Sequence, residues 1–517
     1  MPFQPHMLIP DSFQFGPSWA AAPNVSRIEA PSPRADAAGY AVAESGPVPA
    51  AIGLKRGMLN AAGFSGKVGQ TLVLPQAEGP VIVAIGIGTV DALTAATLRD
   101  AAAAFARAAK IERHLATDLA AVAAAAGLDA ESAASVVIEG VVLARYRYDE
   151  LKTKPETTPF ETLELVDAGG GARGDAAAGT AVAAGIARGL TLARAGMLAR
   201  DLASAPPAYL TATNFADFAL EVGSQVGLQV TVFDKAQLIE LGCGGLLGVN
   251  AGSVEEPRMI QLRYQPAGES TGHLALVGKG ITYDAGGLAL KPGNAMHAAM
   301  KMDMSGAGAV LAAMTTLAEL GCTNTVTGYL MCTDNLPSGS AIALGEVLRM
   351  HGGTTVEVKN PDAEGRLVMA DAITLAKEEG VDAIVDIATL TGAALAALGT
   401  AMAPVFGNDQ VIVDQLLAAS AATDESLWQF PLERRYRELL NSDVADLSNV
   451  GGPHAGAITA ALFLAHFVGE TPWAHLDICG PMMSDKDNSW RSKGPTGFGA
   501  RLLAEFALAY RPYPLVE

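Results

Sequence analysis

The chain has 517 residues, too many for one ordinary domain and enough for two or three. Of these residues 50% are hydrophobic and only 17% are charged, which excludes an intrinsically disordered chain. The 35 basic and 54 acidic residues give a net charge of −19. This charge argues against nucleic acid as a partner and favours a site for metal cations.

The first half of the sequence predicts an irregular N-terminal arm (1–45), a smaller N-terminal α/β domain (46–174) and a linker helix (175–202). The strands expected here are 71–75 and 81–85, and the helices are 92–109, 115–126, 134–146 and 178–202. Glycine-rich residues 167–175 predict a linker before the last helix, which the prolines at 206 and 207 end.

Residues 203–517 predict a larger C-terminal domain. Its expected strands are 229–233, 259–264, 273–277, 325–331, 355–358, 383–388 and 473–478. Its expected helices are 214–222, 307–320, 369–379, 458–467 and 498–506. Because strands alternate with helices, both domains belong to the α/β class, and the C-terminal one is expected to be wound around a mainly parallel central sheet.

Cysteine usage and hydropathy predict a cytoplasmic protein without a membrane span. The four cysteines form no CxxC or CxxH pair, and the first 25 residues lack the basic and apolar regions of a secretory signal. Two uncharged stretches, 387–408 and 447–469, are long enough to cross a bilayer. Their threonines, glycines and histidines favour a buried strand followed by a buried helix instead.

A first candidate site lies in the segment VGKGITYDAGGLALK (277–291) and its continuation to Asp303. Its charged residues are isolated among apolar residues and glycines: Lys279, Asp284, Lys291 and Asp303. Such charges are costly to bury unless they are paired or bind a metal, and the glycines allow the backbone to approach a small ligand closely.

A second candidate site is the segment NPDAEGRL (360–367). If Pro361 keeps the segment extended, Asp362, Glu364 and Arg366 project from one face with a period of two. A surface ladder of salt bridges is the alternative interpretation. The segment follows a strand and precedes an apolar helix, however, which is where open α/β sheets place ligands.

Together the two segments offer four carboxylates, those of Asp284, Asp303, Asp362 and Glu364. Four carboxylates are enough to hold two divalent metals with shared ligands. Two adjacent metals can activate water near neutral pH and polarise a carbonyl. The residues alone therefore favour metal-assisted hydrolysis.

These segments closely resemble the two signature segments of the leucyl aminopeptidase family, the hexameric dizinc cytosol aminopeptidases. Further matches in the same order are RDLASAPP (200–207), NLPSG (335–339), ATLTGA (388–393), AGAITA (455–460), WAHLDI (473–478) and TGFG (496–499). The resemblance is strong over 200–506 and fainter over 81–152. It implies a metal-dependent aminopeptidase that removes N-terminal leucine and other apolar residues from peptides, and a homohexamer.

The resemblance also implies a role for each matching residue. Lys279, Asp284, Asp303 and Glu364 would hold the tighter metal, and Asp284, Asp362 and Glu364 the exchangeable one. The metals would be zinc or manganese, with magnesium as a further candidate. Lys291 would stabilise the tetrahedral oxygen, and Arg366 would hold a bicarbonate ion as general base. The substrate pocket would be lined by Met300, Thr389, Gly392, Cys479 and Met482.

Three features depart from the family pattern. Pro361 replaces a threonine, Cys479 replaces an alanine, and the span from Lys291 to Asp303 is one residue longer. No candidate ligand is lost, so an active enzyme is expected. Two alternatives stay open: a catalytically silent member that acts as a binding protein, for example on nucleic acid, and a dinuclear metal amidase with non-peptide substrates.

Overall fold

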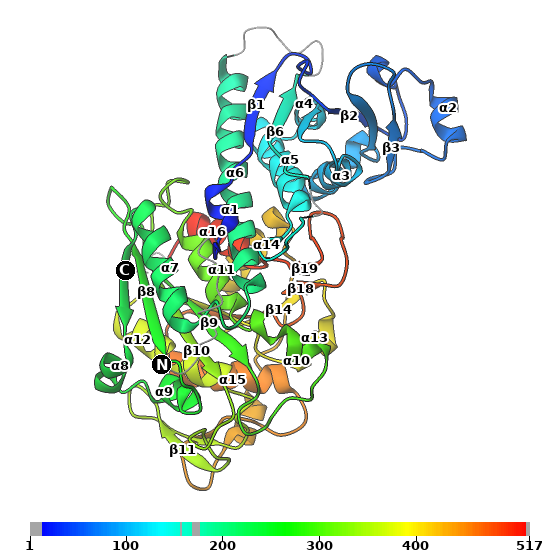
Figure 1. Ribbon diagram of the computed structural model, residues 1–517. Helices are drawn as coiled ribbons and strands as arrows, with labels where there is room; N and C mark the ends of the chain where they lie inside the picture. The colour runs from blue at the N-terminus through cyan, green and yellow to red at the C-terminus, as the bar shows by residue number, and fades with distance from the viewer. Residues whose placement is uncertain (1–12, 156–157, 168–175, 513–517) are drawn as a thin grey trace. The chain divides into compact units, whose positions relative to one another are not determined.

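The described residues fold around two large β-sheets (Figure 1). Each of these sheets packs against its own hydrophobic core. The computed structural model describes residues 13–155, 158–167 and 176–512. These residues divide into an N-terminal unit, Pro17–Met197 with Ser484–Gly494, and a C-terminal unit, Leu198–Met483 with residues 13–16 and 495–512. The two-domain α/β class predicted from the sequence is confirmed.

The N-terminal unit is built on a six-stranded sheet in the order β1-β6-β5-β2-β4-β3. All neighbouring strands are parallel except β3 and β4. The strands are β1 Asn24–Ile28, β2 Ala37–Val42, β3 Thr71–Leu74, β4 Val81–Gly86, β5 His114–Thr117 and β6 Thr162–Val166. The helices are α1 Pro17–Ala20, α2 Arg56–Ala61, α3 Ala95–Ala108, α4 Leu119–Ala125 and α5 Ala130–Arg145.

The prediction of an irregular arm over 1–45 is wrong for its described part, because β1 and β2 both lie in this sheet. Strand β2 consists mostly of alanine and glycine, so it carries little of the β-branched signal by which strands are recognised. The helix predicted at 115–126 also begins too early, since His114–Thr117 is a strand. The predicted linker at 167–175 lies, apart from Asp167, outside the described residues.

Residues Ser484–Gly494, here called the strap, complete the N-terminal unit from far along the chain. Trp490 is fully buried in the core of this unit. Asp487 forms ion pairs with Arg107 at 2.9 Å and with Arg147 at 2.6 Å. The Arg107 guanidinium also donates to the carbonyls of Ser489 and Arg491, both at 2.8 Å. The strap is therefore anchored by one large apolar side chain and by charged contacts around it.

Helix α6, Ala176–Ser204, confirms the long helix predicted from the sequence. By length and composition alone it could cross a membrane, and half of its most apolar window is buried within the structure. A buried core helix meets the same criterion, so α6 is only weak support for a membrane span.

The C-terminal unit is built on an eight-stranded, mainly parallel sheet in the order β15-β14-β17-β13-β9-β10-β8-β7. Its strands are β7 Gln229–Phe233, β8 Arg258–Tyr264, β9 His273–Asp284, β10 Thr325–Asn335, β13 Ala383–Ala388, β14 Ala403–Gly407, β15 Leu427–Gln429 and β17 Trp473–Asp477. Smaller sheets pair β11 Glu346–Arg349, β12 Thr355–Val358 and β16 Leu447–Ser448, and also β18 Met483–Ser484 and β19 Gly494–Pro495.

The helices of this unit are α7 Ala212–Gln225, α8 Lys235–Leu241, α9 Gly244–Asn250, α10 Ala295–Ala298, α11 Ser305–Met314, α12 Gly365–Glu378, α13 Gly392–Leu398, α14 Gln410–Thr423, α15 Gly456–Val468 and α16 Ala500–Ala509. All strands and helices predicted for residues 203–517 are found, with shifts at their ends. The stretch 387–408 holds the end of β13, then α13 and β14, and 447–469 holds β16 and α15.

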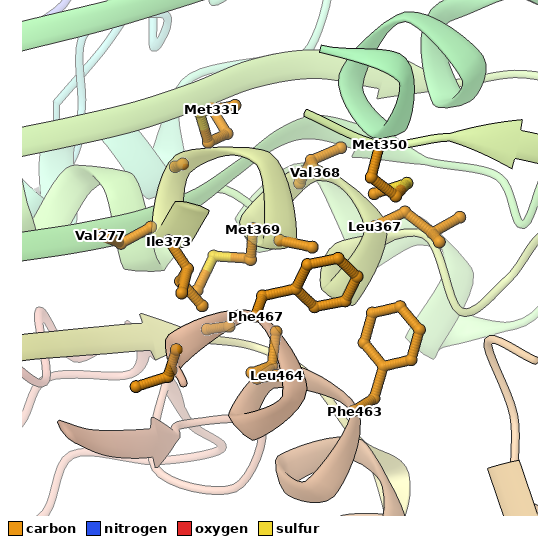
Figure 2. Packing of buried hydrophobic residues seen from close by; sticks show 14 of the residues in the cluster. Val277, Met331, Met350, Leu367, Val368, Met369, Ile373, Phe463, Leu464 and Phe467 are labelled. Carbon is orange, nitrogen blue, oxygen red and sulfur yellow. The ribbon is translucent and has the colours of Figure 1, made fainter. Parts of the chain in front are cut away.

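Helix α12 is the central helix of the C-terminal core. Figure 2 shows its residues Leu367, Val368, Met369 and Ile373 between Val277 and Met331 of the sheet and three apolar residues of α15. The first turn of α12 is buried with the rest, including Gly365 and Arg366. This packing holds the start of α12 beside the sheet, where Glu364 immediately precedes the helix.

Candidate active site

The candidate residues meet at the carboxyl ends of the parallel strands β9, β10, β13 and β17. Asp284 ends β9, Thr389 follows β13, and Cys479 lies two residues after β17. A further carboxylate, Asp303, is presented just before α11. This edge of an open α/β sheet is the usual place for a ligand site.

Three carboxylates form the centre of the cluster. Asp284, Asp362 and Glu364 each place one oxygen within 4.8 Å of the others. The Lys279 ammonium lies 2.8 Å from Asp303 and 2.7 Å from Glu364. The longer span between Lys291 and Asp303 has therefore not removed Asp303 from the cluster. All five predicted metal ligands lie together.

Lys291, the predicted catalytic lysine, faces the same carboxylates. Its ammonium lies 2.7 Å from Asp284 and 2.7 Å from Asp362. It is partly exposed, whereas Lys279 is buried. The two lysines therefore differ in environment, and Lys291 is the one with access to solvent.

Glycines let these side chains come close. A Cβ atom on Gly365 would lie 2.7 Å from Cε of Lys279, so a larger residue here would displace that lysine. Gly286 has a φ of +87°, and a Cβ atom there would lie 2.7 Å from an oxygen of Asp362. Glycine is thus required at both positions for the charged groups to meet.

The segment around Asp362 is a turn, so the prediction of an extended segment with a period of two is wrong. The Asn360 side-chain oxygen accepts the N–H of Asp362 at 3.0 Å, and the N–H of Ala363 donates to the Asn360 carbonyl at 3.1 Å. Asparagine closes such turns through its side chain. Glu364 has helical backbone angles, and Arg366 lies in the first turn of α12.

The cluster holds an excess of negative charge, with four carboxylates facing two ammonium groups. Burial raises the pKa of Glu364, and the charge of Asp284 raises it further. Burial also raises the pKa of Asp303, although Lys279 opposes this effect. For Lys279, burial would lower the pKa, but the charges of Asp303 and Glu364 outweigh it and the net pKa is raised.

This donor set fits divalent metal ions. Glu364 is 1% exposed, and its Oε2 atom has no hydrogen-bond partner among the described residues. Carboxylate oxygens are suitable ligands for zinc, manganese and magnesium, and a cation would offset the excess charge. The nitrogen of Lys279 can serve as a ligand only after it loses its proton, which adjacent dications favour.

Arg366 lies beside this cluster. It is 6% exposed, its Nη1 donates to the Asn449 carbonyl at 2.9 Å, and its Nε atom lacks a hydrogen-bond partner within the described part of the chain. Burial lowers the pKa of Arg366 to about 10, so the guanidinium is charged at neutral pH. The free Nε group can donate to an anion.

Of the predicted pocket residues, Thr389 makes direct contacts with the candidate ligands. Its hydroxyl donates to Asp303 at 2.6 Å, and its carbonyl accepts from Lys279 at 2.9 Å. Burial raises the pKa of the Cys479 thiol, and the negative charges of Asp477 and Asp303 raise it further, to about 12. Cys479 therefore lies close to the candidate ligand Asp303. For Met300, Gly392 and Met482 a place in the pocket stays a prediction.

Two further residues, Asn335 and Asp477, hold this site together, and the sequence alone predicts no role for them. The Asn335 side chain contacts Asp284, and the Asp477 carboxylate accepts the N–H groups of Leu390 and Thr391 and the Thr391 hydroxyl. Both residues lie in segments that match the family, NLPSG and WAHLDI. The match to the family indicates that these segments matter, but it does not show which residues either side chain contacts.

Two family models match most of the chain. Residues 197–504 match the catalytic domain of the cytosol aminopeptidase family, and residues 53–155 match its N-terminal domain. The chain belongs to the cytosol aminopeptidase family. It is accordingly a metallopeptidase of the aminopeptidase class, and the resemblance seen in the sequence is confirmed.

Individual members of the cytosol aminopeptidase family match over most of their length. A probable cytosol aminopeptidase from Chlorobaculum tepidum is 45% identical over 72% of this chain and 75% of its own. One from Alkaliphilus metalliredigens is 38% identical over 88% of this chain and 91% of its own. The solved structure of the bottromycin maturation enzyme BotP in complex with Mn is 40% identical in sequence and has a TM-score of 0.83. The match covers 92% of this chain and 99% of the BotP chain.

Proposed function

We propose that this protein removes N-terminal leucine and other apolar residues from peptides, using two divalent metal ions. The proposal rests on one observation above all: oxygens of Asp284, Asp362 and Glu364 lie within 4.8 Å of one another beside the paired lysines. Manganese is supported by the Mn complex of BotP, and zinc and magnesium suit the same donors.

In the proposed site, Lys279, Asp284, Asp303 and Glu364 hold the tighter metal, and Asp284, Asp362 and Glu364 the exchangeable one. When bound, the metals supply Lewis acidity, a nucleophilic water and a contact for the substrate's free amine. The burial of Glu364 and Asp303 keeps the electrostatic interactions of the site strong by excluding solvent.

The chain's own charged groups then serve the reaction. Lys291, close to Asp284 and Asp362, is placed to stabilise the negative charge that develops on the scissile carbonyl oxygen. Arg366, whose Nε has no hydrogen-bond partner among the described residues, would hold a bicarbonate ion, and that ion would supply a general base. Met300, Thr389, Gly392, Cys479 and Met482 form the pocket for the N-terminal side chain.

We also propose a cytoplasmic homohexamer. The four cysteines are unpaired, in keeping with a reducing compartment. Trp428 is 61% exposed and Val444 is 67% exposed, and contact between subunits would cover apolar side chains of this kind. The mass of the native particle in solution tests this assembly.

The direct test of the function is release of p-nitroaniline from leucine p-nitroanilide with Mn²⁺ or Zn²⁺. We expect activity in the wild type, loss of activity in Glu364→Ala, and unchanged activity in Glu240→Ala, which alters an exposed glutamate. Equal activity in wild type and Glu364→Ala would overturn the metal assignment. A wild type that releases nothing, but shifts DNA on a gel, would be a binding protein.

A further inference from the structure

One side-chain amide forms hydrogen bonds with both of the segments that carry the proposed metal ligands. Nδ2 of Asn335 donates one hydrogen bond to Oδ1 of Asp284, at 2.9 Å, and another to the carbonyl of Pro361, at 3.0 Å. Asn335 is 4% exposed and is the last residue of β10. Both N–H groups of the amide are therefore used, one on each segment.

The bond to Asp284 determines which of its oxygens faces the site. Oδ1 of Asp284 accepts from Asn335 and from the backbone N–H of Gly286 at 2.8 Å. The other oxygen, Oδ2, faces Lys291 at 2.7 Å. The carboxylate is thus held in one orientation, with one oxygen bonded to protein donors and the other directed toward the charged cluster.

The bond to Pro361 fixes the second segment against the first. Pro361 precedes Asp362, and the ring of proline removes the N–H that another residue would offer for anchoring here. Its carbonyl remains, and Asn335 is the donor that binds it. The amide thereby joins the Asp284 carboxylate to the residue before Asp362, in addition to the Lys291 ammonium, which contacts both carboxylates.

The surroundings keep this amide in place. A Cβ atom on Gly287 would lie 2.9 Å from Oδ1 of Asn335 and 3.2 Å from Cβ of Pro361. A cavity of about 10 Å³, the space of a single water, is lined by Asn335, Gly287 and Pro361 with apolar neighbours. The side chain consequently has little room to turn away from its two acceptors.

We propose that Asn335 is a positioning residue for the proposed dinuclear metal site, because its amide orients the Asp284 carboxylate and holds the turn that carries Asp362 beside it. This inference rests on the proposed function. Residues that orient metal ligands commonly contribute about 10–100-fold to metal affinity. We therefore expect removal of the amide donor to weaken metal binding by that factor.

The test measures Mn²⁺ binding to metal-free protein by isothermal titration calorimetry, and the exchange-coupled spectrum of paired Mn²⁺ by electron paramagnetic resonance. The variants are Asn335→Leu, which keeps a similar size and no charge but removes both donors, and Asn335→Ala. We expect a roughly 10–100-fold higher Kd and a weaker coupled spectrum in both.

Asn324→Ala is the matched control. Asn324 is also buried in the C-terminal unit, and its amide also joins two carbonyls, those of Ala507 at 2.9 Å and Tyr510 at 3.0 Å. We expect this variant to lose thermal stability in EDTA while its Mn²⁺ affinity stays at the wild-type value. Melting in EDTA also shows whether each Asn335 variant is folded.

The outcomes separate the two proposals. Wild-type protein that fails to bind two Mn²⁺ ions per chain would overturn the proposed dinuclear function itself. Wild-type protein that binds two, with folded Asn335 variants that bind them within twofold of the wild-type Kd, would overturn only the positioning role. A Kd that rises equally in Asn324→Ala would also overturn it, because the effect would then reflect general destabilisation.

Discussion

Lysine occupies two different positions in the charged cluster. Lys279 is buried between Asp303 and Glu364, and its side chain has space only because residue 365 is glycine. Lys291 contacts Asp284 and Asp362 from a partly exposed position. The first environment suits a ligand, and the second suits a group that meets the substrate.

This difference predicts the effect of Lys291→Ala. Removing a cation that competes for Asp284 and Asp362 leaves the carboxylates free, so Mn²⁺ affinity is expected to stay the same or rise. The rate constant kcat is expected to fall by about 10²–10³-fold, because a charge that stabilises the transition state is lost. Steady-state kinetics and calorimetry measure the two effects, with exposed Lys235→Ala as control. Parallel losses of kcat and affinity would contradict the assigned role.

At the scale of elements, the site is an edge of the sheet. Strands β9, β10, β13 and β17 end together, and α12 begins beside them. Loop residues are then bonded to the strand ends, as Leu390 and Thr391 are to Asp477. The N-terminal unit is also stabilised by contacts between segments that are distant in the chain, because its sheet and the strap share one hydrophobic core.

The strap predicts a large effect for Trp490→Ala. Truncation of this fully buried side chain should lower the free energy of unfolding of the N-terminal unit by about 3–5 kcal/mol. Hydrogen exchange of peptides from α3 and α5 measures the change. Ile239→Ala, which alters an exposed apolar side chain of α8 in the C-terminal unit, is the control. Unchanged exchange in the N-terminal unit would contradict the anchoring function of the strap.

Asp118, which follows β5, predicts a pH dependence for the N-terminal unit. Burial raises its pKa from 3.8 to about 7. Since the folded-state pKa lies above the unfolded value, the contribution of Asp118 to stability is full below pH 4 and is lost as the pH rises through 7. The loss amounts to about 4 kcal/mol at most.

Asp118→Asn should remove this part of the pH dependence and make the unit more stable than wild type at pH 8. The stability of the N-terminal unit between pH 4 and 8 is measured by hydrogen exchange of the peptide containing β2, because the Ala41 N–H in this strand donates to Asp118. The control is Asp129→Asn, because the pKa of Asp129 is lowered and its titration lies below this range. A wild-type profile in Asp118→Asn would refute the assignment.

At the scale of the whole molecule, all proposed metal ligands belong to the C-terminal unit, since they lie between residues 279 and 364. Ligand binding stabilises the part of a protein that forms the site. Metal-dependent protection should therefore be confined to one of the two units.

At Mn²⁺ concentrations of 100 times the Kd of each site, the C-terminal unit should gain about 2.7 kcal/mol of stability per bound ion, hence about 5.4 kcal/mol for two, and the N-terminal unit should gain none. Hydrogen exchange with Mn²⁺ and with EDTA, read separately for peptides of the two units, distinguishes them. Glu364→Ala should show no gain in either. Equal protection of both units would mean that they unfold as one.

The family, the α/β class, the number of domains and the residues of the charged cluster could all be predicted from the sequence. This was possible because the candidate ligands and the glycines beside them lie close together in two short segments. Gly286, Gly365 and the carboxylates are therefore recognisable by their spacing in the sequence. The sequence pattern missed β2, because a strand rich in small residues has no periodic signal of its own and is stabilised by its neighbours in the sheet. It also missed β1, a five-residue strand at the edge of the sheet that pairs with β6.

Only the tertiary structure decided how the site is held. A hydrogen bond to the side chain of Asn360 closes the Asp362 turn. The amide of Asn335 binds Asp284 and Pro361, which are distant from it in the chain. Trp490 of the strap likewise packs against residues that are far from it in sequence. Such contacts arise when strand ends meet at one edge of a sheet. Composition and spacing carry no information about which atoms will then lie within hydrogen-bond distance.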